Sequence, residues 1–284
     1  MPEVDTDRQE AEYQELLAIF MQLARAIKTN NGQWESLEEL MEARANIAIK
    51  HALDGFGITL EEAAKLIEKR DDLTDEQLVN RNIVIAAIDN LIDFSVAAEY
   101  QMAHDLPDIE EYDDEEDLEE MDEDELEMML AVFAKYNKHY ANIENLDVEY
   151  AMIIAAFYSK IANDSILTYY TQGDHRVRPW HRQYEGFSAP KSRFPAWLIP
   201  PIEYNCRCFL VEEHVSAIGQ IQNSATPKMP DWFNPVFKES VAQGGKIFSD
   251  EHPYFQVDKK HVKTLTDIAL RIKDKYNLNG SDNR

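Results

Sequence analysis

Hydrophobic positions in the first third of the chain recur at the three- and four-residue spacing of amphipathic helices. Apolar residues between Tyr13 and Ile27 follow the i, i+3, i+4, i+7 rule, and Asn30-Asn31-Gly32 is typical of a helix end. A Ser or Thr followed three residues later by Glu or Gln has the form of a capping box and predicts a helix start. Three such starts are at Ser36, Thr59 and Thr74.

Two further features complete this helical region. The run Asp54-Gly55-Phe56-Gly57 predicts a turn, because two of its four residues are glycine, which favours turns. From Asp75 to His104 the apolar pattern predicts either one long helix or two helices broken near Asn90. Residues 1–104 are therefore expected to form a helical N-terminal region.

An acidic segment, residues 105–127, interrupts the pattern. It holds 16 Asp or Glu residues among 23 and no Lys or Arg. Such a block repels itself and is usually solvated, so it predicts a linker. Two other interpretations are a flexible arm that docks on a basic partner and an acidic mimic of nucleic acid that blocks a host protein.

Periodic structure resumes after the acidic segment. Helical spacing runs through residues 126–140 and 150–161, and the β-branched and aromatic run 166–170 predicts a strand that can pair with residues 209–211. A tail rich in turn signals and aromatics leads to a last predicted helix over residues 259–276. The expected fold class is α+β, with a mostly helical N-terminal region, a small mixed β module with irregular loops, and a C-terminal helix. The expected segments are 1–104, 105–127, 128–237 and 238–284.

Charge and composition narrow the classes of function. The 284 residues carry a net charge of -26, but residues 171–284 hold 16 basic and 13 acidic side chains. Non-specific duplex binding depends on neutralising phosphates, so any contact with DNA is expected through the C-terminal half. No apolar run is long enough for a membrane span, the first residues are acidic where a signal peptide is basic, and two cysteines cannot build a disulfide framework.

The stretch Thr171–Val211 fits neither a helical nor a strand period. Its chemically distinctive residues are Asp174, Arg176, Arg178, His181, Gly186, Pro200, Pro201, Cys206, Arg207 and Cys208. In an extended segment, Cys-x-Cys points both thiols to one face. Pairing of the two predicted strands would set Asp174 and the cysteines at neighbouring strand ends. Asp174, His181, Cys206 and Cys208 are therefore candidate ligands of a metal such as zinc.

Two other interpretations of the same residues stay open. Buried cysteine is common without any ligand role, so this stretch can equally form a metal-free core. An enzyme is the other alternative, in which the four candidate ligands hold a zinc-bound water for hydrolysis or nuclease chemistry and arginine holds phosphate. A nucleophilic Cys-His pair has no obvious third group in the sequence.

The same stretch resembles the phage Mu protein F-like family of head-morphogenesis or minor head proteins. That family carries D-x-R-V-R-x-x-H-x-x-L-x-G, a loop with Phe and Trp, and P-P-x-x-x-x-C-R-C. The matching residues are Asp174, Arg176, Val177, Arg178, His181, Gly186, Phe194, Trp197, Pro200, Pro201, Asn205, Cys206, Arg207 and Cys208. The resemblance extends over residues 130–237 and identifies the segment 128–237 as a Mu F-like domain.

The resemblance implies a minor head protein and not an enzyme. Such a protein is incorporated into the virion during head assembly in the host cytoplasm, at the head interior or the portal vertex. The partners it implies are the portal protein, the major capsid protein and, in some cases, packaged DNA. The motif residues would then form a rigid structural module, with zinc as its only candidate cofactor.

Overall fold

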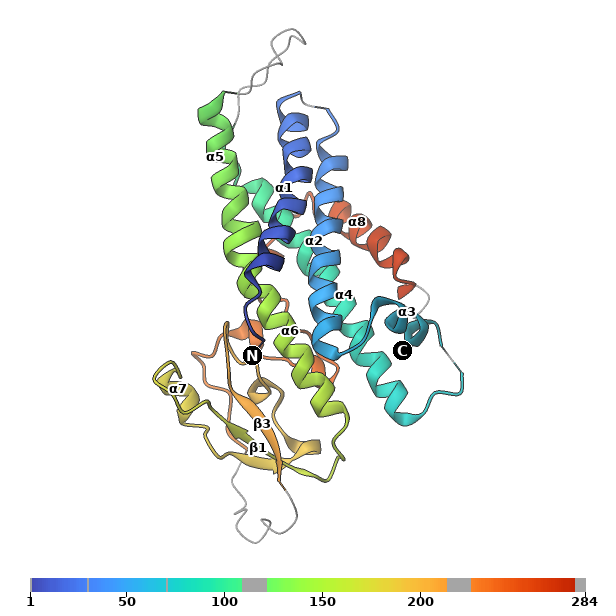
Figure 1. Cartoon of the computed structure of the whole chain (residues 1–284), viewed down its shortest axis with the longest axis vertical. Helices are drawn as coiled ribbons and strands as arrows, with labels where there is room; N and C mark the ends of the chain where they lie inside the picture. Colours follow the sequence, from blue (N-terminus) through green and yellow to red (C-terminus); the bar gives the residue numbers. More distant parts are fainter. Residues whose placement is uncertain (1, 30, 70, 109–121, 214–225, 279–284) are drawn as a thin grey trace. The chain divides into compact units, whose positions relative to one another are not determined.

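The computed structural model describes residues 2–29, 31–69, 71–108, 122–213 and 226–278 (Figure 1). The α-helices are α1 (Thr6–Lys28), α2 (Gln33–Phe56), α3 (Leu60–Glu68), α4 (Asp75–His104), α5 (Glu123–Ala134), α6 (Ala141–Ser159), α7 (Pro179–Arg182) and α8 (Val262–Lys275). The strands are β1 (Ile166–Tyr170), β2 (Ser188–Pro190) and β3 (Phe209–Glu213). The predicted mostly helical α+β class with a small β module and a C-terminal helix is confirmed. All strand pairs described are antiparallel.

Two compact units make up the chain, and each is assembled from separate segments. Within the described residues, unit 1 takes in 51–90 and 146–252, and unit 2 takes in 3–50, 91–145 and 253–278. The sequence-based segments 1–104, 105–127, 128–237 and 238–284 remain a prediction, because each unit draws on several of them. Most of the acidic segment, residues 109–121, lies outside the described residues, and α5 begins at Glu123 within it.

Capping explains where several helices begin. Thr59 and Glu62 form the reciprocal capping box that opens α3, and Thr74 and Gln77 exchange the equivalent pair of bonds at the start of α4, both at 3.2 Å. The helix start predicted at Ser36 is wrong, because α2 already begins at Gln33. A capping-box pattern inside an established helix has no free backbone N–H groups to cap.

Gly55 belongs to a helix and not to the predicted turn. Helix α2 continues to Phe56, and Gly57, with a φ of 83°, follows its end. A Cβ on Gly55 would lie 2.2 Å from the carbonyl oxygen of Glu149 in α6. The glycine therefore allows the backbones of α2 and α6 to approach closely within unit 1.

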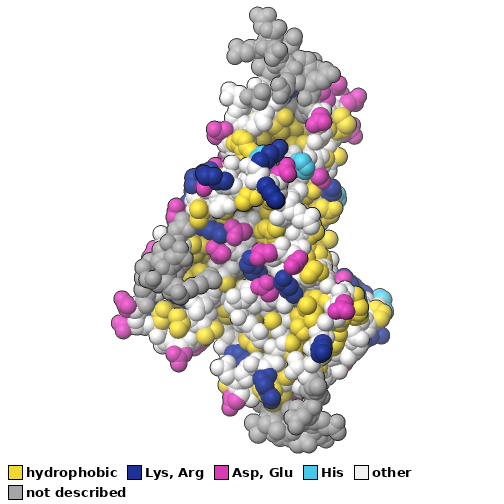
Figure 2. All heavy atoms as spheres, turned by 180° about the vertical axis from the view of Figure 1, so that it is seen from behind, with side chains coloured by type: hydrophobic (Ala, Val, Ile, Leu, Met, Phe, Trp, Pro, Cys, Tyr) yellow, Lys and Arg dark blue, Asp and Glu magenta, His cyan; other side chains and the backbone are white. Residues whose placement is uncertain are grey.

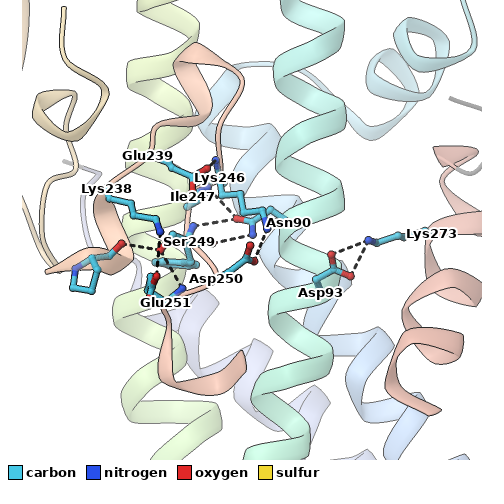
Figure 3. A network of polar contacts seen from close by, with 12 residues as sticks. Asn90, Asp93, Lys238, Glu239, Lys246, Ile247, Ser249, Asp250, Glu251 and Lys273 are labelled. Carbon is cyan, nitrogen blue, oxygen red and sulfur yellow. Dashed lines mark hydrogen bonds and ion pairs between the residues drawn. The ribbon is translucent and has the colours of Figure 1, made fainter. Parts of the chain in front are cut away.

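Asn90 does not break α4, which is a single helix. Its buried side chain accepts hydrogen bonds from the backbone N–H groups of Ile247 and Phe248, and it donates to the carbonyl oxygen of Phe248, all at 3.0 Å (Figure 3). A buried amide with both ends bonded is stabilising, whereas an unpaired one is costly. Asn90 thus ties an otherwise irregular part of the tail to α4 within unit 1.

The interior of unit 2 holds a buried ionic cluster. The guanidinium of Arg44 in α2 donates to Glu99 in α4 at 2.9 Å and to Glu144 in α6 at 2.6 Å. Tyr254 donates to the other oxygen of Glu144 at 2.9 Å. Arg44 is 4% exposed and Glu99 is fully buried. Burial raises the pKa of both carboxyls despite the nearby guanidinium, and the charge of Glu144 adds to the rise at Glu99.

A π-helical segment, Lys135–Tyr140, completes that cluster between α5 and α6. Its Asn137 side chain accepts from Arg44 at 2.7 Å and donates to Glu99 at 3.1 Å, and the carbonyl oxygen of Tyr136 accepts from Arg44 at 3.2 Å. The wider π turn therefore presents both a side chain and a backbone acceptor to one buried cation. Helical periodicity predicts a helix here but not its π form.

Apolar and ionic contacts hold the remaining helices of unit 2. Phe20 of α1 stacks on Phe133 of α5 with ring centroids 4.4 Å apart, and Figure 1 shows these two helices side by side. Helix α8 begins three residues later than predicted, and its first residue, Val262, is 48% exposed. Lys273 of α8 pairs with Asp93 of α4 at 2.8 Å (Figure 3). Within the described residues, no helix has the length and apolar character of a membrane span.

Candidate metal centre

The small sheet of unit 1 brings the motif together. Strand β1 is central, and its pairing with β3 places Tyr170 opposite Phe209, as the sequence predicted for these runs. Strand β2 was not predicted, because three residues ending in proline give no strand signal. Segments that follow β1 and precede β3 therefore meet at one end of the sheet.

His181, Cys206 and Cys208 form a compact group at this end. Their ligand atoms all lie within 4.8 Å of one another, and the three residues could hold a metal ion. The Nδ1 atom of His181 lies 3.2 Å from the sulfur of Cys208 and 3.9 Å from that of Cys206. The side chains are sealed from solvent, since the three residues are between 1% and 2% exposed.

Asp174 is not part of this group, and its predicted role as a fourth ligand is corrected. Its two carboxylate oxygens accept hydrogen bonds from the Arg207 guanidinium at 2.7 and 2.9 Å, in a bidentate pair. Arg207 stands between the cysteines, so an extended backbone turns its side chain away from theirs. Asp174 therefore holds the Cys-Arg-Cys segment from outside and is not a ligand.

The Asp174 carboxyl is expected to stay ionised down to about pH 2, because its hydrogen bonds from Arg207 lower its pKa to that value. Its stabilising effect should be present above the unfolded-state pKa of about 3.9 and be lost as the pH falls through about 2. A carbon-detected NMR titration of the carboxyl measures this. Arg207→Ala should return the pKa toward about 3.9, and a wild-type carboxyl that already titrates there would refute the pairing.

Glu203 was missed by the sequence analysis and faces the other side of the His181 ring. Its Oε2 atom lies 3.3 Å from Nε2 of His181, accepts from Nε1 of Trp180 at 3.2 Å, and pairs with Nε of Arg178 at 3.1 Å. A carboxylate accepts hydrogen bonds, so Nε2 of His181 carries the proton and Nδ1 presents its lone pair to the thiols. No sequence signal other than its place between the proline pair and the cysteines singled out Glu203.

Backbone anchors fix the loop that carries the two cysteines. Asn205 adopts a φ of 56°, and its N–H donates to both oxygens of the buried Asp147 at 2.9 and 3.0 Å. Arg178 donates to the carbonyl oxygen of Tyr204 at 2.9 Å, and the Tyr150 hydroxyl donates to that of Cys208. Asp147 and Tyr150 are both in α6, where the sequence analysis predicted helical spacing over residues 150–161 but no contact with the cysteine loop.

The remaining motif residues shape the surrounding loops. Gly186 has a φ of 78° and donates from its N–H to the carbonyl oxygen of Tyr169 at 2.9 Å, which explains why glycine stands there. The Pro200–Pro201 peptide bond is cis, and both prolines are buried. Arg176 is exposed, and its backbone N–H donates to Asp174 at 3.0 Å. These residues are structural in their contacts.

The two thiols differ in acidity. Burial raises the pKa of Cys206 well above its ordinary value, whereas a hydrogen bond from Cys206 lowers the pKa of Cys208. The buried hydroxyl of Tyr169 lies beside Cys208 and interacts with its side chain, although it makes no hydrogen bond of regular geometry. The His181 imidazole, the two thiols and this hydroxyl are therefore buried close together.

This arrangement suits a closed structural centre. Trp180 lies against His181 with ring centroids 4.0 Å apart, and no ligand atom of the group is open to solvent. Two sulfurs and one imidazole nitrogen are the ligand types that soft divalent metals prefer. Comparison of the chain with family models, with curated proteins and with solved structures finds no match.

Proposed function

We propose that this protein is a minor head protein of a bacteriophage or prophage, incorporated into the head during assembly. The observation that carries the proposal is the convergence of the motif residues in one unit, where they bond to one another and to the backbone. Asp174, His181 and Cys208 each serve the local fold in this way. Such contacts suit a rigid docking module better than a site that turns over a substrate.

Zinc is the proposed ion of the His181, Cys206 and Cys208 group. Thiolate and imidazole ligands favour zinc over hard cations such as magnesium or calcium. A metal at this point would link the loop after β1 to the segment before β3. Its proposed role is structural, because the buried ligands leave no open approach for a substrate.

The proposed partners are the portal protein and the major capsid protein, with the protein at the portal vertex or inside the shell. Packaged DNA is a further proposed contact of the C-terminal half. On the face shown in Figure 2, however, Lys and Arg side chains lie among Asp and Glu side chains, and the residues described there form no continuous basic patch. On this face, contacts with protein therefore fit the described side chains better than contacts with DNA.

The rival proposal is a metal-dependent hydrolase or nuclease. A three-ligand site resembles catalytic zinc centres, which keep one position for water. Against it stand the burial of His181 and the engagement of Asp174 by Arg207. Arg178, a candidate phosphate ligand, is also occupied by Glu203 and the backbone of Tyr204.

Particle assembly tests the proposed function directly. The gene would be deleted from an inducible prophage that encodes the protein and restored in trans with a C-terminal tag. The expected result is tagged protein in purified heads, in few copies, and co-purification with the portal protein before DNA packaging. Heads that assemble at normal yield without the protein, with no tagged protein in the particles, would contradict the proposal.

A further inference from the structure

The distances around His181 fit a tetrahedral zinc ion. With Zn–S bonds of about 2.3 Å and a Zn–N bond of about 2.05 Å, tetrahedral geometry puts sulfur and nitrogen about 3.6 Å apart. The observed separations from Nδ1, 3.2 Å to Cys208 and 3.9 Å to Cys206, lie on either side of that value. Small movements of the two thiols would therefore place these three ligand atoms at tetrahedral distances from one ion.

A simple thiol–imidazole hydrogen bond explains less of the site. It accounts for the contact between Cys208 and His181, but it leaves Cys206 at a longer distance. It also leaves the buried Tyr169 hydroxyl with only the Cys208 thiol beside it and no hydrogen bond of regular geometry. A bound ion would convert Cys208 into a thiolate, which is a stronger acceptor for that hydroxyl than a thiol. The position of the hydroxyl beside Cys208 thus agrees with a thiolate at that residue.

Glu203 provides a hydrogen-bond acceptor for the ring nitrogen of His181 that faces away from the thiols. Histidine ligands generally donate their other ring N–H to a carboxylate or carbonyl, which fixes the tautomer and the ring orientation. Glu203 lies within 3.3 Å of Nε2 and is itself held by Trp180 and Arg178. Arg178 and His181 both lie in the stretch Thr171–Val211, and both contact this one carboxylate.

We propose that Glu203 is the positioning residue of a zinc centre whose ligands are His181 Nδ1, Cys206 Sγ and Cys208 Sγ. By accepting the hydrogen bond from Nε2, Glu203 holds the imidazole in the tautomer that presents Nδ1 to the metal. Tyr169 donates to the Cys208 thiolate when the metal is bound. This inference rests on the proposed zinc site and not on the role of the protein in a phage head.

Metal titration of the full chain tests the assignment. Protein stripped by a chelator under reducing conditions would be titrated with Zn²⁺ in competition with a chromophoric chelator, and with Co²⁺ to detect thiolate ligation by absorbance. Glu203→Ala is expected to weaken zinc binding 10- to 100-fold. Glu203→Gln keeps an acceptor oxygen and should recover most of the affinity. Glu251→Ala, a surface carboxylate of the same unit, is the control and should bind as wild type.

A nitrogen-resolved NMR spectrum of the wild-type imidazole separates positioning from a general structural role, and it remains informative if Glu203→Ala does not fold. The expected spectrum of zinc-loaded protein has His181 protonated at Nε2 and metallated at Nδ1. Ligation through Nε2, wild-type affinity in a folded Glu203→Ala protein, or no zinc binding at all would each overturn the assignment. Incorporation into heads is scored separately, so failure here is distinguishable from failure of the proposed function.

Discussion

Arg44→Ala is expected to destabilise unit 2 by about 3–5 kcal/mol, because it leaves two buried carboxyls without their shared cation. Glu99 and Glu144 bond to the same guanidinium, and both are buried. Urea denaturation followed by circular dichroism measures the loss. Arg271→Ala is the matched control, because Arg271 pairs with Glu38 at the surface, where such pairs contribute about 0–1 kcal/mol.

The effect of Arg44→Ala should depend on pH. Both carboxyls have raised pKa values in the folded state, so the folded chain binds more protons than the unfolded chain above the ordinary carboxyl pKa. Stability therefore falls as the pH rises through that window, and more steeply once Arg44 is removed. If Arg44→Ala lost no more stability than Arg271→Ala, or if its loss of stability were constant from pH 5 to 8, the result would count against the buried cluster.

Cys208→Ser is expected to abolish stoichiometric zinc and the stability that zinc supplies. Binding to the folded state alone stabilises by about 4 kcal/mol when free metal is a thousand times its dissociation constant. Thermal melts with and without chelator isolate this contribution from the loss of the buried sulfur itself. The melting temperature of wild-type protein should fall on chelation, whereas that of Cys208→Ser should not change.

Glu251→Ala is the control for that measurement. Its side chain pairs with Lys238 at the surface of the same unit, so the variant should keep zinc and keep its response to the chelator. Equal melting curves for wild-type protein with and without chelator would contradict a metal-held fold. So would freshly reduced wild-type protein that contains no zinc by elemental analysis.

Local patterns in the sequence were enough to predict much of the fold. The capping boxes at Thr59 and Thr74 and the pairing of residues 166–170 with 209–211 are confirmed. These features depend on residues close in sequence or on strong strand propensity. Gly55 was wrongly assigned to a turn. Glycine stands there because the backbone of Glu149, about ninety positions away, lies too close for a side chain, and no local pattern contains that contact.

The candidate site was also predicted only in part, because the sequence does not show which distant residues come into contact. The Cys-x-Cys spacing and the nearby histidine were sufficient to name His181, Cys206 and Cys208 as candidate ligands of one metal, and the structure brings these three together. Asp174 was misassigned, because the sequence does not reveal that Arg207 takes both of its oxygens. Glu203 was missed, because a carboxylate that orients a ligand has no spacing rule of its own.

Hydrogen exchange of backbone amides in Thr171–Val211, read by mass spectrometry with and without chelator, tests the central claim most directly. That claim is a rigid module held by a metal at His181, Cys206 and Cys208. The account predicts strong protection in zinc-loaded protein and its loss in this stretch on chelation, while residues 91–104 of unit 2 exchange unchanged. Rapid exchange of the stretch in zinc-loaded protein, or identical exchange with and without chelator, would contradict it.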